Sequence, residues 1–127
     1  MEKTYPIVLV YRTPDLILNR LTPLLRNHGI SVRVVRKEQY TVPLNVLLGI
    51  KQPGRALPGL GIELAEPMLI MHGFSSELVD VVLKLLRENS IRIDLKAVTT
   101  PTNLAWTSLQ VYAELRKERE TFLNQNK

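Results

Sequence analysis

The sequence predicts an α/β fold of two tandem strand–helix–strand–helix repeats, which form a four-stranded parallel or mixed sheet with helices packed on it. Residues 6–35 align without a gap on residues 67–96, a displacement of 61 positions. Each copy opens on an unbroken run of apolar β-forming residues, which is typical of an inner strand buried on both faces. Apolar residues at helical spacing follow each run. A strand, helix and strand joined in this way pair in parallel.

The first repeat begins with an inner strand at 6–11. Thr13-Pro14-Asp15 then starts a helix, with threonine as its cap and proline at a favourable first position. Pro23 removes one backbone hydrogen bond, so we expect a kink there or a restart with Thr22 as a new cap. Gly29 is expected to end the helix in a left-handed conformation. The buried stripe of this helix is Ile17, Leu21, Leu24 and Leu25.

Two shorter elements complete the first repeat. Residues 30–35 alternate, with Ile30, Val32 and Val34 on one face, and this one-sided pattern predicts an edge strand. Residues 43–49, which begin with proline and end with glycine, predict a short helix.

The second repeat follows the same plan. An inner strand at 68–72 leads into a helix that Ser75 caps, with a core stripe of Leu78, Val82, Leu85 and Leu86. The next strand has Ile91, Ile93 and Leu95 on one face. Thr100-Pro101 is expected to open the last helix, which then frays from Arg116 onward. Its apolar stripe is Leu104, Ala105, Leu109, Tyr112 and Leu115.

A connection rich in proline and glycine, residues 51–66, joins the two halves. The length of the chain predicts a single domain over 1–127. We expect this domain to be built of two pseudo-repeats, 6–50 and 67–115. The sequence leaves open whether the halves meet in parallel or about a pseudo-twofold axis.

The composition excludes several kinds of chemistry. The chain has no cysteine, which excludes disulfides, thiolate metal sites and a catalytic thiol and fits a reducing compartment. Its only two histidines, His28 and His72, are 44 residues apart and make no metal signature. We expect no cofactor and no membrane association, and we expect the protein to be cytoplasmic, because no apolar run is long enough for a span.

A candidate ligand site lies where the predicted strands end. In an open α/β sheet, ligands gather at the carboxyl ends of the strands. Hydroxyl, amide and imidazole groups are expected there, without a cluster of carboxylates: Tyr11, Thr13, His72, Ser75, Thr99, Thr100 and Asn103. We predict that His72, Ser75, Thr100 and Asn103 bind a ligand, although each also has a structural role as a cap, turn or strand end. No catalytic residue is predicted, because no spacing joins His72 to a nucleophile and an orienting partner.

A second candidate is the basic segment 31–57. The net charge of the protein is +5, and this segment carries five basic residues against only one acidic residue, Glu38. Arg33, Arg36 and Lys37 are its candidate anion-binding residues. The alternative interpretation is a solvated surface that keeps the protein soluble. Tyr40 is the only aromatic residue in the segment, which argues against RNA binding by base stacking.

Residues 67–115 resemble a bacterial family known only as a domain of unknown function. The resemblance rests on the strand before Gly73-Phe74-Ser75, the helix through Leu86, and the stretch from Leu95 through Asn103 to Trp106. The first half departs from this pattern, with Arg12-Thr13-Pro14 at the turn and no equivalent of Trp106. The resemblance implies a small bacterial protein and no established activity. It marks Lys96, Thr100, Asn103 and Trp106 as the residues to test first, but it carries over no binding role. Our own candidates include Lys96 as a ligand contact and, from its residue type, Trp106 as an interface anchor.

Three functional hypotheses follow. We favour a non-catalytic binding or regulatory module for a protein or small-molecule partner, because the polar strand ends carry no reactive constellation. The alternative is binding of RNA or another polyanion through segment 31–57. The third is an enzyme that uses His72. Edge strands also invite pairing, so a homodimer is compatible with all three.

Overall fold

The structure of the protein is a computed structural model that describes residues 5–54 and 61–125. It contains four strands, β1 (Ile7–Tyr11), β2 (Ser31–Val35), β3 (Met68–His72) and β4 (Leu95–Val98). The helices are α1 (Asp15–Arg26), α2 (Leu44–Leu47), α3 (Ser76–Glu88) and α4 (Ser108–Gln125), with 3-10 turns η1 (Lys37–Gln39) and η2 (Asn103–Ala105). The predicted connection at 51–66 forms no helix or strand at 51–54 and 61–66, and its residues 55–60 lie outside the described ranges.

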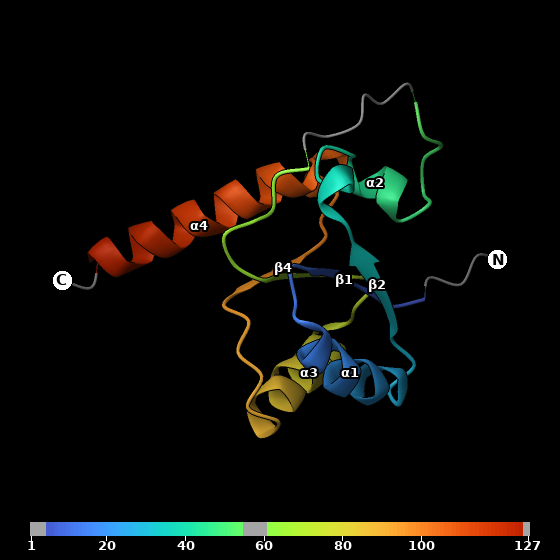
Figure 1. Ribbon diagram of the computed structural model, residues 1–127, viewed down its shortest axis with the longest axis vertical. Helices are drawn as coiled ribbons and strands as arrows, with labels where there is room; N and C mark the ends of the chain where they lie inside the picture. The colour runs from blue at the N-terminus through green and yellow to red at the C-terminus, as the bar shows by residue number, and fades with distance from the viewer. Residues whose placement is uncertain (1–4, 55–60, 126–127) are drawn as a thin grey trace. The chain divides into compact units, whose positions relative to one another are not determined.

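The four strands form one mixed sheet in the order β2-β1-β3-β4 (Figure 1). The two apolar runs are therefore its inner strands and the alternating segments its edges, as predicted. β1 pairs with β2 in parallel, and β3 pairs with β4 in parallel. Each parallel pair is joined through a helix, because parallel strands cannot be connected by a tight turn.

The two halves of the sheet meet through an antiparallel pair, β1 and β3, in which Leu9 faces Ile70. Tyr11 pairs with Met68 and His72 pairs with Ile7, so Tyr11 and His72 lie at opposite ends of the paired strands. The expectation that Tyr11, Thr13 and His72 share one sheet edge is therefore wrong. That expectation holds only for an all-parallel sheet, in which all carboxyl ends point the same way.

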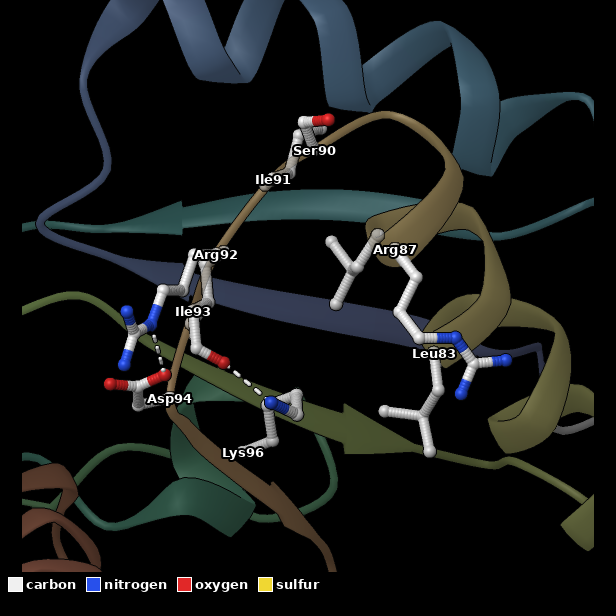
Figure 2. Close-up of a pocket in the computed structure, with 9 residues that line it drawn as sticks. Leu83, Arg87, Ser90, Ile91, Arg92, Ile93, Asp94 and Lys96 are labelled. Carbon is white, nitrogen blue, oxygen red and sulfur yellow. Dashed lines mark hydrogen bonds and ion pairs between the residues drawn. The ribbon is translucent and has the colours of Figure 1, made fainter.

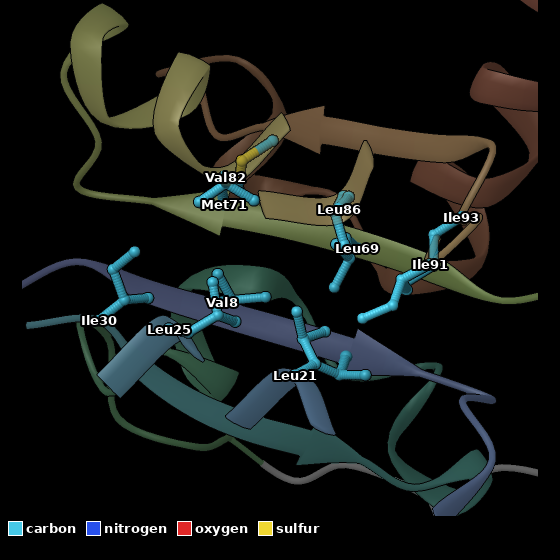
Figure 3. Close-up of a cluster of buried hydrophobic side chains, with 11 residues drawn as sticks. Val8, Leu21, Leu25, Ile30, Leu69, Met71, Val82, Leu86, Ile91 and Ile93 are labelled. Carbon is cyan, nitrogen blue, oxygen red and sulfur yellow. The ribbon is translucent and has the colours of Figure 1, made fainter. Parts of the chain in front are cut away.

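One face of the sheet carries the main apolar core, which α1 and α3 cover (Figure 3). The strands contribute residues such as Val8 and Leu69, and the helices contribute Leu21, Leu25, Val82 and Leu86. Alternate residues of the inner strands, Leu9 and Ile70 among them, are also fully buried. Both faces of β1 and β3 are thus removed from water, which explains their unbroken apolar sequence.

The contacts divide the chain into two compact units. The sheet unit consists of the chain up to Val35 together with 65–99, and it holds all four strands with α1 and α3. The helical unit consists of the described parts of 36–64 and of the chain from Thr100 onward. The boundaries therefore differ from the pseudo-repeats, since both strand–helix–strand segments fall in one unit.

The helical unit joins two distant segments of the chain. Leu44 N donates to Trp106 O at 2.9 Å, and Leu109 N donates to Tyr40 O at 3.3 Å. Tyr40 is buried, and its hydroxyl donates to the carboxylate of Glu63. The predicted short helix at 43–49 is confirmed as α2, and its first residue, Leu44, makes one of these bonds.

The start and the interior of α1 differ from the prediction. Pro14 is the N-cap residue, while the Thr13 hydroxyl donates to Tyr11 O at 3.2 Å and caps nothing. The helix continues through Pro23 without a restart at Thr22. Leu21 and Leu25 are fully buried on either side of the proline, so the apolar burial of this stripe compensates for the missing hydrogen bond.

The edge strands also differ in detail from the sequence pattern. On β2, Val34 is 53% exposed while Val35 is buried, so the predicted buried face does not continue to the end of the strand. The first strand and first helix of each half begin 61 residues apart, but β4 begins at Leu95 instead of residue 92. Leu95 pairs with Met68, the first residue of β3, and 91–94 precede any partner on that strand.

The last helix starts later than predicted, and it also continues beyond the position where we expected it to fray. Residues 103–105 form the 3-10 turn η2, and α4 begins at Ser108. Thr107 and Gln110 make reciprocal bonds, Thr107 N to Oε1 at 2.8 Å and Gln110 N to Oγ1 at 3.3 Å, which form a capping box at this start. The helix then runs to Gln125, past the predicted fraying point at Arg116.

The buried face of α4 consists of Ser108, Val111 and Tyr112, whereas Leu109 is exposed. The predicted stripe is therefore wrong at Leu104, Ala105 and Leu109. No helix in the described ranges combines the length and the hydropathy that crossing a bilayer requires.

Candidate functional site

A cavity of about 460 Å³ opens in the sheet unit between the end of α3 and the start of β4 (Figure 2). We call it the α3–β4 cavity. Its residues come from the last turns of α3, the extended segment 91–94 and the beginning of the edge strand: Leu83, Leu86, Arg87, Ser90, Ile91, Arg92, Ile93, Asp94 and Lys96. The volume lies within the range of small-molecule sites in proteins.

The apolar part of the cavity is continuous with the core. Leu86, Ile91 and Ile93 line it and also belong to the main apolar cluster of the sheet unit. Ile91 and Ile93 remain buried although 91–94 form no strand. Because β4 starts only at Leu95, these two isoleucines lie beside α3 and are not paired with a neighbouring strand. The cavity lies between this unpaired segment and the end of α3.

The polar part carries three cations and one carboxylate, which gives the cavity a positive balance. Arg92 Nε lies 3.0 Å from Asp94 Oδ1, and this hydrogen bond and charge raise the pKa of Arg92 above its ordinary value. Lys96 Nζ donates to Ile93 O at 2.5 Å. An ammonium group has three donors, so two remain for a ligand.

Arg87 is the least engaged of these cations. Within the described ranges, its guanidinium has no hydrogen-bond or ion-pair partner. By contrast, the neighbouring exposed cation on the same helix, Lys84, lies 3.7 Å from Glu88 and does not line the cavity. Arg87 thus offers a free planar donor set, which matches carboxylate and phosphate oxygens.

The other predicted ligand residues of the sheet unit lie at the carboxyl ends of β3 and β4. His72 Nδ1 lies 2.8 Å from Thr99 Oγ1, and partial burial lowers the pKa of His72 from its ordinary value of 6.5. The Ser75 hydroxyl accepts from Leu78 N at 3.1 Å, so it caps α3 as predicted. The partner of the His72 ring is therefore the hydroxyl of Thr99. The hydroxyl of Ser75 bonds to the end of α3 instead.

Thr100, Asn103 and Trp106 lie in the helical unit. Thr100 N donates to Asn103 Oδ1 at 2.8 Å, and Asn103 N donates to Thr100 Oγ1 at 3.0 Å. This reciprocal pair closes the turn before η2. Trp106 lines a surface cavity of about 430 Å³ with the α4 residues Gln110, Ala113, Glu114 and Lys117.

The candidate anion-binding residues divide between the two units. Arg33 is exposed on β2 in the sheet unit, while Arg36 and Lys37 are exposed at η1 in the helical unit. Arg55–Leu57, the end of the basic segment, lies outside the described residues. The ligand role of each of these cations stays a prediction.

Sequence reasoning missed most of the α3–β4 cavity. It selected Lys96 but not Arg87, Arg92 or Asp94, because the cavity depends on where β4 begins to pair and no local motif specifies that register. Within the ranges that the structure describes, no three histidine, aspartate or glutamate side chains converge as a metal site.

Comparison of the chain with curated proteins and with solved structures gave no match. A family comparison did give one, over the segment from the start of β3 into α4. Residues 67–122 match the family described as Domain of unknown function (DUF3783). This match confirms the predicted resemblance to a domain of unknown function, and the matched segment includes the described residues that line the α3–β4 cavity.

Proposed function

We propose that the protein is a non-catalytic, cytoplasmic binding module that takes a small amphiphilic anion in the α3–β4 cavity. The observation that carries this proposal is the guanidinium of Arg87, which has no partner within the described ranges and lies beside an apolar surface that is continuous with the core. An anionic head would contact Arg87 and Lys96, while an apolar tail would cover Ile91 and Ile93. A fatty carboxylate of medium length has this chemistry.

Electrostatics favour an anion over a neutral ligand of the same shape. Asp94 already accepts from Arg92, which leaves Arg87 and Lys96 to act on the ligand. A charge-assisted hydrogen bond is roughly twice as strong as a neutral one. The apolar lining adds affinity in proportion to the area that the tail removes from water.

The non-catalytic part of the proposal rests on the groups that line the cavity. Among the described residues that line it, the one carboxylate is Asp94, which is bonded to Arg92, and His72 is not among them. The described lining thus consists mainly of cations and apolar side chains, and its carboxylate already accepts from an arginine. A binding role requires only these cations and apolar side chains, because the cations contact an anionic head group and the apolar side chains contact its tail.

The experiment is a titration of ¹⁵N-labelled protein with octanoate, followed by amide chemical shifts, with octanamide as the uncharged match. We expect octanoate to shift the amides of 87–96 and octanamide to bind several-fold more weakly. Arg87→Gln and Lys96→Gln should each weaken octanoate binding about three- to tenfold. Lys84→Gln, which removes a cation of α3 outside the cavity, is the control and should leave affinity unchanged.

Two results would contradict the proposal. Equal binding of octanoate and octanamide would show that the cations do not recognise the head group. Equal weakening by Lys84→Gln and Arg87→Gln would reduce the effect to the general charge of the surface.

A further inference from the structure

The surface cavity beside Trp106 in the helical unit has a volume of about 430 Å³. We call it the α4 cavity. It is lined by one aromatic residue, one small residue, one amide and two charged residues: Trp106, Ala113, Gln110, Glu114 and Lys117. All of them belong to the helical unit, so the cavity is a feature of that unit alone. None of them is buried, so each is accessible to a molecule in the cavity.

The lining residues of α4 lie on one side of the helix. Gln110, Ala113, Glu114 and Lys117 follow the three- and four-residue spacing of a single helix face. Ala113 lies in the middle of this face, and its short side chain leaves space that a longer one would fill. Trp106, which precedes the helix, adds an indole ring to the wall of this space. A molecule in the cavity can therefore contact an aromatic ring and two opposite charges.

The two charged residues of the cavity do not pair with each other. Glu114 and Lys117 are three positions apart, and side chains at this spacing are neighbours with Cβ atoms about 5–6 Å apart. No ion pair joins them, and neither charged group has another hydrogen-bond or ion-pair partner in the part of the chain that the structure describes. A ligand that carries a cation and an anion a short distance apart would satisfy both residues at once.

Trp106 and Gln110 indicate which kind of cation fits. The face of an indole ring attracts cations and binds quaternary ammonium groups, whose methyl groups also pack on the ring. A primary ammonium group instead has three N–H donors that need acceptors. The lining offers few, because Gln110 Oε1 already accepts from Thr107 N at 2.8 Å and Glu114 is the one carboxylate among the described lining residues. A quaternary ammonium group has no N–H and needs no acceptor.

We propose that the α4 cavity binds a small betaine, a molecule in which a short carbon chain joins a trimethylammonium group to a carboxylate. The trimethylammonium group contacts the indole face of Trp106 and lies near Glu114. The carboxylate accepts from the ammonium group of Lys117. This site is separate from the α3–β4 cavity, and the two proposals do not depend on each other.

The test uses three ligands and the fluorescence of Trp106, the only tryptophan of the chain. Glycine betaine carries both charged groups. In 3,3-dimethylbutanoate a carbon atom replaces the cationic nitrogen without a change of shape, and in choline a hydroxyl group replaces the carboxylate. Glycine betaine should change the emission of Trp106 saturably and should bind about three- to tenfold more tightly than either of the other ligands.

Two variants should separate the two charged contacts. Glu114→Gln should weaken glycine betaine and choline about threefold or more and should not weaken 3,3-dimethylbutanoate. Lys117→Gln should weaken glycine betaine and 3,3-dimethylbutanoate by a similar factor and should not weaken choline. Arg116→Gln and Glu118→Gln are the matched controls, because they remove exposed charges of the same helix that are not among the lining residues. Both controls should leave the three affinities unchanged.

Equal affinity of glycine betaine and 3,3-dimethylbutanoate for the wild-type protein would overturn the proposal, because the cation would then not be recognised. Equal affinity of glycine betaine and choline would overturn it too, since the carboxylate would have no partner. So would the absence of a saturable change in Trp106 emission at millimolar glycine betaine. None of these results depends on the folding of a variant. Octanoate shifts at 87–96 report on the α3–β4 cavity, so failure of one site is distinguishable from failure of the other.

Discussion

Ser90 holds after α3 the left-handed turn position that Gly29 holds after α1, with φ angles of 56° and 74°. In each turn the next isoleucine closes back on the helix, with Ile30 N donating to Leu25 O at 3.1 Å and Ile91 N donating to Leu86 O at 2.9 Å. Both isoleucines are buried. The two helices therefore end in the same turn. Glycine adopts the left-handed conformation of this turn without cost, whereas the Cβ atom of Ser90 makes that conformation unfavourable.

The Ser90→Gly variant should be more stable than the wild-type protein. Glycine can keep the left-handed conformation without the strain that a Cβ atom causes. The substitution should therefore raise the free energy of unfolding by about 0.5–1 kcal/mol, measured by urea denaturation. Gly29→Ser is the matched control and should lower it by a similar amount. A Cβ at Gly29 meets no atom within 4 Å, so that loss would come from the backbone alone. Destabilisation by Ser90→Gly would show instead that the serine side chain holds the turn.

The stability of the protein should fall on acidification below neutral pH through His72. Burial lowers the pKa of His72 in the folded protein below its ordinary value of 6.5, so the unfolded chain binds the proton more tightly. The stability that neutral His72 contributes is fully present above pH 6.5, and it is lost as the pH falls toward the pKa of His72 in the folded protein. Urea midpoints between about pH 5.5 and 8, where carboxylates stay ionised, measure it. His72→Gln should flatten this slope, and an identical slope in both proteins would contradict the prediction.

RNA should bind the protein weakly or not at all. Tyr40, the only aromatic residue of the basic segment, is 2% exposed and its hydroxyl is bound to Glu63, so its ring is not free to stack on a base. We expect no saturable binding of a fluorescent oligouridine at about 50 mM salt. Binding that is tight there and weakens steeply with added salt would favour the polyanion alternative. Arg33→Gln, Arg36→Gln and Lys37→Gln would then locate the contacts.

The sequence was sufficient to predict the sheet and its inner strands. The unbroken apolar runs at 6–11 and 68–72 have few other stable environments, and the alternation at 30–35 suits an edge. The antiparallel pairing of β1 with β3 was left open because it depends on a long connection. The late start of β4 was missed for a similar reason, since its register is set by a partner 27 residues earlier.

The start of α4 was predictable but was placed too early. Thr107-Ser108-Leu109-Gln110 has the spacing of a capping box, while Thr100-Pro101 resembles a helix start and forms a turn before η2. The α3–β4 cavity could not be predicted in the same way. The freedom of Arg87 depends on which distant segments pack nearby, and its residue type carries no local signal.

Thr100 and Asn103 should contribute to stability and not to octanoate binding. Each side chain accepts from the backbone N–H of the other residue, so alanine at either position leaves one donor of the turn unpaired. Each substitution should lower the free energy of unfolding by about 1 kcal/mol, measured in urea. Neither residue lines the α3–β4 cavity, so octanoate affinity should stay unchanged, whereas Lys96→Gln should show the opposite pattern. If Asn103→Ala weakened octanoate binding more than it lowered stability, the predicted ligand role of Asn103 would stand.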